Sequence, residues 1–118
     1  MVKDRKNLAH DRLVDLVSAR FLLAGFEVQN ETPLPSGRGA VDISGKLGDS
    51  QFHAEVKISP TSLNKKKVQK QLERYEAHFG SNADYLLISP GANGEVIVQD
   101  SERNFKGGLD SYISRIAA

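Results

Sequence analysis

The stretch VDISGKLGDSQFHAEVKI, residues 41–58, predicts two short antiparallel strands joined by a tight turn. Every second residue from Phe52 to Ile58 is apolar, and the residues between them are polar, which is the period of a strand with one buried face. Gly48-Asp49 fits a two-residue hairpin loop that has glycine at its first central position. This loop sets the predicted register of the two strands.

Counting outward from the loop, the register places Ile43 opposite Ala54 and Val41 opposite Val56, so the apolar residues of both strands share one side. The same register places Asp42 opposite Glu55 on the polar side. Two carboxylates that face each other across a strand pair repel, and the pair weakens the sheet. The arrangement therefore calls for a cation, a shared proton or enough solvent to screen the charge.

Lys57, two residues beyond Glu55 on the same face, supplies one positive charge but cannot balance both carboxylates. A hard divalent ion can, because Mg²⁺ is commonly held by one or two carboxylates together with water and phosphate oxygens. An aspartate on one strand and Glu-x-Lys on the next therefore point to a metal-assisted phosphodiester site.

Length and composition predict a single domain spanning residues 1–118. The apolar content of 39% and the charged content of 26% are ordinary for a soluble globular protein. The absence of cysteine excludes disulfides and thiolate metal sites. We expect a cytoplasmic protein with no membrane partner, because no signal core or membrane-spanning stretch is visible. The net charge of +1 means that any nucleic-acid binding must come from local basic patches.

Hydrophobic periodicity predicts an α/β fold with the order α-β-β-β-α-β-β-α. Outside the central hairpin, helices are expected at about 8–24, 64–79 and 109–116, and strands at 26–30, 84–89 and 95–99. The segment from Thr32 to Gly39 has the composition of a loop. The long second helix is a crossover, so the strands on either side of it should be parallel neighbours in a mixed sheet.

Other candidate residues lie on the predicted helices. On the first helix, His10 falls on the inward stripe, Asp11 on its flank and Asp15 well away from it. On the central hairpin, His53 shares the polar face with Glu55 and either lines the cleft or faces solvent. The second helix carries a basic face that would suit a polyanionic partner: Lys65, Lys66, Lys67, Lys70 and Arg74.

The order helix, strand, Asp strand, Glu-x-Lys strand, helix and strand resembles the PD-(D/E)XK nuclease superfamily, the restriction-endonuclease-like fold. Val41 stands where the eponymous proline is often found. The GFEV segment at residues 25–28 and the SGRG loop at residues 36–39 look like archaeal Holliday junction resolvases. Those enzymes carry a glutamate at the start of the first helix, where this chain has His10, Asp11 and Asp15. The segment QLERY at residues 71–75 is instead similar to the QxxxY pattern of the RecB-type branch, in which a first-helix histidine joins the metal site. The resolvase-like and RecB-type branches of the superfamily both remain candidates.

The resemblance implies a three-layer α/β/α fold and an Mg²⁺-dependent deoxyribonuclease, with Mn²⁺ as a substitute ion. Asp42, Glu55 and Lys57 would be the catalytic residues, and the metal ligands would be Asp42, Glu55, the Val56 carbonyl and His10. Gln71 and Tyr75 would support the site. The phosphate contacts would be Arg38, Lys65, Lys66, Lys67, Lys70 and Arg74.

The expected partner is DNA, cut by a homodimer that is selective for structure, as Holliday junction resolvases are. Whether the substrate is a four-way junction, a duplex, a single strand or RNA is left open, and so is any sequence specificity. The alternatives are a RecB-type repair or restriction nuclease, a non-catalytic nucleic-acid-binding domain on the same fold, and a protein-interaction domain in which the carboxylate pair is a coincidence.

Overall fold

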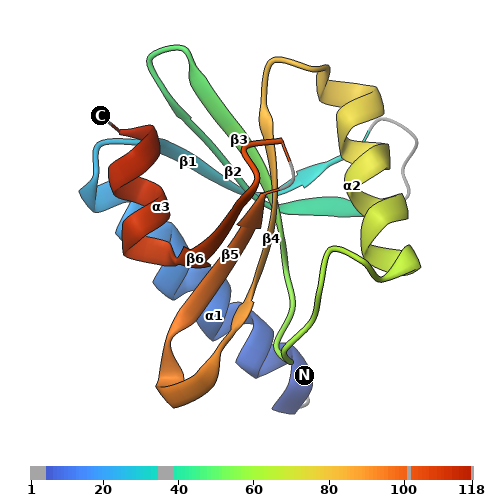
Figure 1. The fold of residues 1–118 in the computed structure, drawn as a ribbon, viewed down its shortest axis with the longest axis vertical. Coiled ribbons are helices and arrows are strands. Elements are labelled where there is room, and N and C mark those ends of the chain that lie inside the picture. The colour runs from blue at the N-terminus through green and yellow to red at the C-terminus, as the bar shows by residue number, and fades with distance from the viewer. Residues whose placement is uncertain (1–4, 35–38, 101, 118) are drawn as a thin grey trace.

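The computed structural model describes residues 5–34, 39–100 and 102–117 (Figure 1). The elements in chain order are α1 (Arg5–Leu23), β1 (Glu27–Pro33), β2 (Ala40–Leu47), β3 (Ser50–Val56), α2 (Lys66–Phe79), β4 (Asp84–Pro90), the 3₁₀ turn η1 (Ala92–Gly94), β5 (Val96–Asp100), β6 (Phe105–Gly108) and α3 (Leu109–Ile116). None of the helices in the described ranges is both long enough and apolar enough to span a membrane.

The strands form one mixed sheet in the order β1-β2-β3-β4-β5-β6. Neighbouring strands are antiparallel except β3 and β4, which are parallel and are joined through α2. The parallel pair confirms the predicted crossover. The buried run from Tyr85 to Ser89 in β4 also confirms the expectation of a strand covered on both faces.

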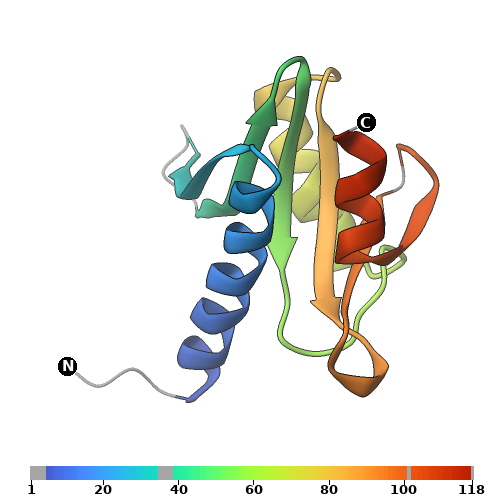
Figure 2. The same cartoon turned by 90° about the vertical axis from the view of Figure 1, so that its left-hand side faces the viewer.

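Helices cover both faces of the sheet and make three layers, as predicted. Figure 2 shows α1 and α3 on the near side of the sheet and α2 behind it. The α1/α3 side holds the larger core, in which the Phe21 ring stacks on Phe52 with 4.2 Å between the ring centroids. The α2 side holds a smaller core around Leu72, Tyr75 and Leu87.

The central hairpin has the predicted register between Ile43 and Leu47. The ladder ends at Ile43 and Ala54, so the predicted pairs Asp42–Glu55 and Val41–Val56 lie beyond it, and the Val56 N–H donates to the Asp42 carboxylate instead. Ile43 pairs with Ala54, and Leu47 pairs with Ser50 across the Gly48-Asp49 loop. Gly48 has φ of +58°, a conformation that glycine adopts at little cost. A second glycine, Gly45, is needed for packing, because a Cβ there would lie 2.1 Å from Cε2 of Phe52.

Four other details differ from the prediction. The strand β3 ends at Val56 rather than at residue 58, and β1 continues to Pro33 through residues predicted as loop. Val41 does not share a side with Ile43, because it packs in the α2 core while Ile43 packs in the α1/α3 core. The strand therefore bends at Asp42, between them. The fourth difference is β6, a strand of only four residues that the sequence pattern did not reveal.

Candidate active site

Asp42 lies where β2 bends, and its carboxylate is held in place by groups from two other elements. Its Oδ2 accepts a hydrogen bond from the backbone N–H of Val56 in β3 at 2.8 Å. His10 of α1 places Nε2 3.3 Å from the same oxygen. The Asp42 side chain is 16% exposed, so its carboxylate remains open to a small ligand while its orientation is restricted.

Glu55 brings a second carboxylate from β3 to the same place. It is buried at 5% exposure, and its Oε2 accepts a hydrogen bond from the Tyr75 hydroxyl of α2 at 2.5 Å. Gln71, one turn earlier on α2, places Nε2 3.4 Å from the Tyr75 hydroxyl oxygen. The helix therefore orients Glu55 through Tyr75, and Gln71 stands behind Tyr75.

The two carboxylates are close enough to affect each other's protonation. Burial, and then the negative charge of Asp42, raise the pKa of Glu55 to about 7, while the hydrogen bond from Tyr75 opposes the rise. Burial, and then the charge of Glu55, also raise the pKa of Tyr75 well above its ordinary value. Tyr75 therefore remains a hydrogen-bond donor, and the pair of carboxylates concentrates negative charge that a cation would relieve.

Lys57 follows β3 directly and reaches back to Glu55. Its Nζ lies 3.6 Å from Glu55 Oε1, and its side chain is 41% exposed, so the ammonium is available to a ligand. The backbone N–H of Lys57 donates to the carbonyl of Ile88 at 2.9 Å, which continues the parallel pairing one residue beyond β3. The structure thus brings Asp42, Glu55 and Lys57 together at one end of the β2–β3 pair.

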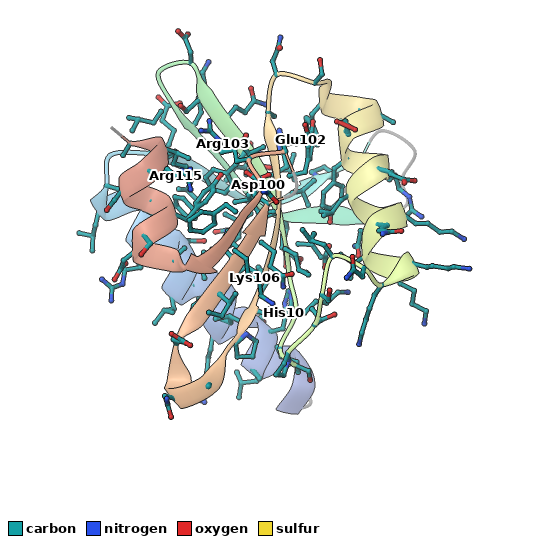
Figure 3. All side chains as sticks on the ribbon, in the orientation of Figure 1. His10, Asp100, Glu102, Arg103, Lys106 and Arg115 are labelled. Carbon is teal, nitrogen blue, oxygen red and sulfur yellow. The ribbon has the colours of Figure 1, made fainter. Side chains whose placement is uncertain are left out.

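The first-helix candidates are separated by their positions on α1. His10 points toward the sheet and lies beside Asp42, and Figure 3 labels it on α1 next to the strands. Asp11 places Oδ1 3.7 Å from His10 Nδ1, so it lies behind the histidine rather than beside Asp42. Asp15 is exposed further along the helix. Of the three, His10 is the one in contact with a carboxylate of the site.

The basic residues of α2 are exposed, as a ligand-binding surface requires. The helix has no acidic residue in its first turn and begins with lysines, an arrangement that opposes the helix dipole. Lys67, Gln71 and Arg74 follow one another at intervals of four and three residues, so they share the side of the helix from which Gln71 approaches Tyr75. Arg38 lies outside the described residues.

His53, for which the sequence left two positions open, neither faces solvent nor contacts the carboxylates. It is 3% exposed and stacks on Phe79 with the ring centroids 3.7 Å apart. Its ring nitrogens lie 2.8 Å from Ser44 Oγ and 2.9 Å from Gln51 Nε2. Burial, and then the charge of His78, lower the pKa of His53 to about 4, so it is a neutral packing residue at pH 7.

Asn30 is a site neighbour that the sequence did not reveal. Its Nδ2 donates to Ser18 Oγ at 2.9 Å and lies 3.4 Å from the backbone carbonyl of Asp42. The next residue, Glu31, has φ of +52°, in the left-handed region. The edge strand is therefore distorted where it passes the bend at Asp42. An asparagine in an edge strand carries no sequence signal for such a role.

The donor set is compatible with a hard divalent cation. In the described ranges no three His, Cys, Asp or Glu side chains form a metal-holding group by themselves. Mg²⁺ is usually held by one or two carboxylates, with water and substrate oxygens completing the shell. Asp42 and Glu55 offer carboxylates of this kind, and burial, followed by the charge of Asp42, raises the pKa of Glu55. The Val56 carbonyl stays a predicted ligand.

Comparisons with known proteins place the fold. The chain matches no family model and no curated protein sequence. Among solved structures it is similar to Hjc, a Holliday junction resolvase from Archaeoglobus fulgidus, with a TM-score of 0.56 and 18% identity over 86% of this chain and 88% of that one. The chain therefore shares the fold of this resolvase. A repair endonuclease from Pyrococcus abyssi is also similar, with a TM-score of 0.50 and 19% identity over 80% of this chain and 42% of that one. The comparisons confirm the predicted fold class and the predicted structural likeness to an archaeal Holliday junction resolvase.

Proposed function

We propose that this chain is a metal-dependent DNA endonuclease that hydrolyses phosphodiester bonds. The observation that carries the proposal is the convergence of Asp42, Glu55 and Lys57: Lys57 Nζ lies 3.6 Å from Glu55, and burial, followed by the negative charge of Asp42, raises the pKa of Glu55 to about 7. Two carboxylates and an ammonium at the end of neighbouring strands are the groups that phosphodiester hydrolysis with a divalent ion requires.

Asp42, Glu55 and the Val56 carbonyl would hold the ion, with His10 either joining them or keeping Asp42 in position through its 3.3 Å contact. When bound, the ion would supply a Lewis acid for the scissile phosphate and lower the pKa of a coordinated water. Lys57 would orient the attacking water and stabilise the negative charge that develops on the phosphate. Tyr75 would keep Glu55 aimed at the site through its hydrogen bond, with Gln71 behind it.

DNA would lie along the exposed lysines and Arg74 of α2. These side chains would contact phosphates, which position a duplex without reading its sequence. The likeness to a Holliday junction resolvase makes a four-way junction the first substrate to test. We further propose a homodimer, because two copies would present two sites to two strands.

The proposal is tested by incubating labelled four-way, duplex and single-stranded DNA with the protein in Mg²⁺ or in EDTA. We expect cleavage in Mg²⁺, none in EDTA, and a loss of at least about 10²-fold in Asp42→Asn. The matched control is Asp15→Asn, which makes the same change at an exposed position of α1 and should cleave like the wild type. Cleavage that survives EDTA, or equal activity in Asp42→Asn, would contradict the proposal. Binding of DNA without any cleavage would favour a non-catalytic binding domain on this fold.

A further inference from the structure

Helix α1 exposes leucines on the side that faces away from the sheet. The large apolar side chains that are exposed in the described ranges all belong to this helix: Leu8, Leu16, Leu22 and Leu23, with exposed fractions from 41% to 83%. Successive residues of an α-helix turn by about 100°, so these four leucines lie within about a third of its circumference. We call this surface the leucine face. Exposed apolar surface gathered on one side of an element marks a contact with a partner.

The fold uses the other side of α1. Val14, Val17 and Phe21 fill the larger core, where the helix packs on β1, β2, β3 and α3. His10 also lies on this inner side, beside Asp42. A partner on the leucine face would therefore leave the core and the candidate active site as they are.

Two opposite charges lie among the leucines. Arg12 and Asp15 are exposed and fall on the same third of the helix. In the described part of the chain neither of them takes part in an ion pair. Their charges cancel, so the leucine face does not attract a polyanion. An aspartate among leucines is costly against lipid, whereas a protein surface with opposite charges at the same spacing would satisfy both residues.

The leucine face is complementary to itself. In an antiparallel pair of α1 helices centred between residues 15 and 16, Leu8 meets Leu23 of the partner subunit at each end, and the two copies of Leu16 meet near the centre. Arg12 then lies about 6 Å along the axis from the partner's Asp15, within reach of an arginine side chain. The four charges make a neutral cluster at the centre. A surface that matches its own copy after a two-fold rotation is what a closed symmetric dimer needs.

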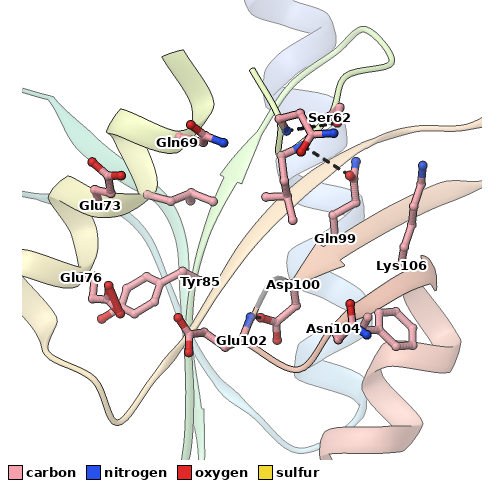
Figure 4. A pocket seen from close by; sticks show the side chains of 14 residues that line it. Ser62, Gln69, Glu73, Glu76, Tyr85, Gln99, Asp100, Glu102, Asn104 and Lys106 are labelled. Carbon is pink, nitrogen blue, oxygen red and sulfur yellow. Dashed lines mark hydrogen bonds between the residues drawn. The ribbon is translucent and has the colours of Figure 1, made fainter. Parts of the chain in front are cut away.

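Pairing through α1 would leave the side of the molecule that carries α2 free. Figure 2 shows α1 on one side of the sheet and α2 on the other. Figure 4 shows that the hollow between α2 and β5 is lined by polar side chains, among them Gln69, Glu73 and Glu76 of α2. The α2 side thus offers charged and amide groups rather than exposed leucines. Its lysines could contact DNA while α1 is paired.

We propose that the leucine face of α1 binds a second copy of this chain as an antiparallel helix pair. This inference rests on the nuclease homodimer proposed above and assigns its interface. The leucines carry the affinity, because an exposed ion pair adds little and mainly fixes the register, so loss of one such charge leaves the dimer in place. A single helix pair is a small interface, so we expect a dissociation constant on the order of 10 μM.

Sedimentation equilibrium of the full chain, in EDTA and without DNA, tests the dimer at concentrations from about 1 to about 200 μM. Leu16→Glu places two more negative charges at the centre of the pair and should weaken dimerisation at least about tenfold. The matched control Ala77→Glu makes an apolar-to-glutamate change at an exposed position of α2 and should dimerise like the wild type. A wild type that stays monomeric throughout this range, or equal association in Leu16→Glu, would overturn the proposal. Binding of a monomeric wild type to phosphatidylglycerol vesicles would identify a membrane contact and overturn it as well.

Single cysteines test the orientation of the helices without disturbing the fold, because the chain has no cysteine of its own. Leu8→Cys mixed with Leu23→Cys should be cross-linked by a short bis-maleimide. Each variant alone should not be, because antiparallel pairing keeps like positions about 22 Å apart. Glu73→Cys on α2, mixed with Leu23→Cys, is the control and should not be cross-linked. Cross-linking of Leu8→Cys with itself, or none in the first mixture, would contradict the antiparallel pair. Neither experiment uses DNA or Mg²⁺, so a failed interface and a failed nuclease are told apart.

Discussion

Replacing Glu55 by glutamine should remove the pH dependence of stability that this residue imposes. Glu55 is buried beside Asp42, and burial, followed by the charge of Asp42, raises its pKa from 4.5 to about 7. The unfolded chain releases this proton more readily than the folded chain. The contribution of Glu55 to the free energy of unfolding is therefore fully present below pH 4.5 and is lost as the pH rises through 7.

The difference between the ordinary pKa of Glu55, 4.5, and its pKa in the folded protein, about 7, sets the size of the change in the free energy of unfolding. Each pH unit is worth about 1.4 kcal/mol, so the metal-free wild type should lose about 3 kcal/mol relative to Glu55→Gln between pH 4 and pH 8.5. Glutamine keeps an oxygen that can accept the Tyr75 hydrogen bond, so the comparison isolates the charge. The variant should be the more stable protein at pH 8.5 in EDTA, although it would lose activity.

The assay is urea unfolding followed by circular dichroism in EDTA, from pH 4 to pH 8.5, for wild type and Glu55→Gln. Glu95→Gln is the control, because it removes a carboxylate from an exposed position and should follow the wild type. Adding Mg²⁺ at pH 8.5 should stabilise the wild type and leave Glu55→Gln unchanged. If the difference between wild type and Glu55→Gln stays constant across this pH range, Glu55 does not carry the buried charge described above.

Three further predictions concern single side chains. Gly45→Ala should lower the free energy of unfolding by about 1–3 kcal/mol in urea titration, because the added Cβ would meet the Phe52 ring at 2.1 Å. The control is Gly108→Ala, whose Cβ would meet nothing within 4 Å, and an equal loss in both variants would contradict the overlap. Tyr75→Phe should lower kcat by at least about tenfold with little change in DNA affinity, because it removes the donor that orients Glu55; an unchanged kcat would mean that this hydrogen bond serves stability alone. Lys67→Ala combined with Arg74→Ala should reduce the salt dependence of duplex binding, the slope of log K against log[salt], by about 2. Lys106→Ala, at an exposed position of β6, should leave that slope unchanged, and equal slopes in all three proteins would exclude this side of α2 from the DNA contact.

The hairpin and the helices could be predicted because their signals are local. The alternation after Phe52 and the Gly48-Asp49 loop determine the register of β2 and β3 without any distant contact. The helix predicted at residues 64–79 likewise corresponds to α2, in which Val68, Leu72 and Tyr75 recur at helical spacing and are buried.

Other features depend on contacts between distant residues. The bend at Asp42 moves Val41 into the α2 core and occurs beside the distorted edge strand at Glu31. Neither an aspartate nor a glutamate in a strand predicts such a bend. The strand β6 was not predicted, because its sequence, Phe-Lys-Gly-Gly, has no alternation of apolar and polar residues. It exists because it pairs with β5. The burial of His53 depends on Phe79, 26 residues later, which stacks on its ring.

The most direct test of the central claim is the position of a divalent ion in crystals of the wild-type chain soaked in Mn²⁺, located by anomalous diffraction. The account predicts one peak bound by carboxylate oxygens of both Asp42 and Glu55, and its loss in crystals of Glu55→Gln. A peak that touches neither carboxylate, or one that persists unchanged in Glu55→Gln, would contradict it.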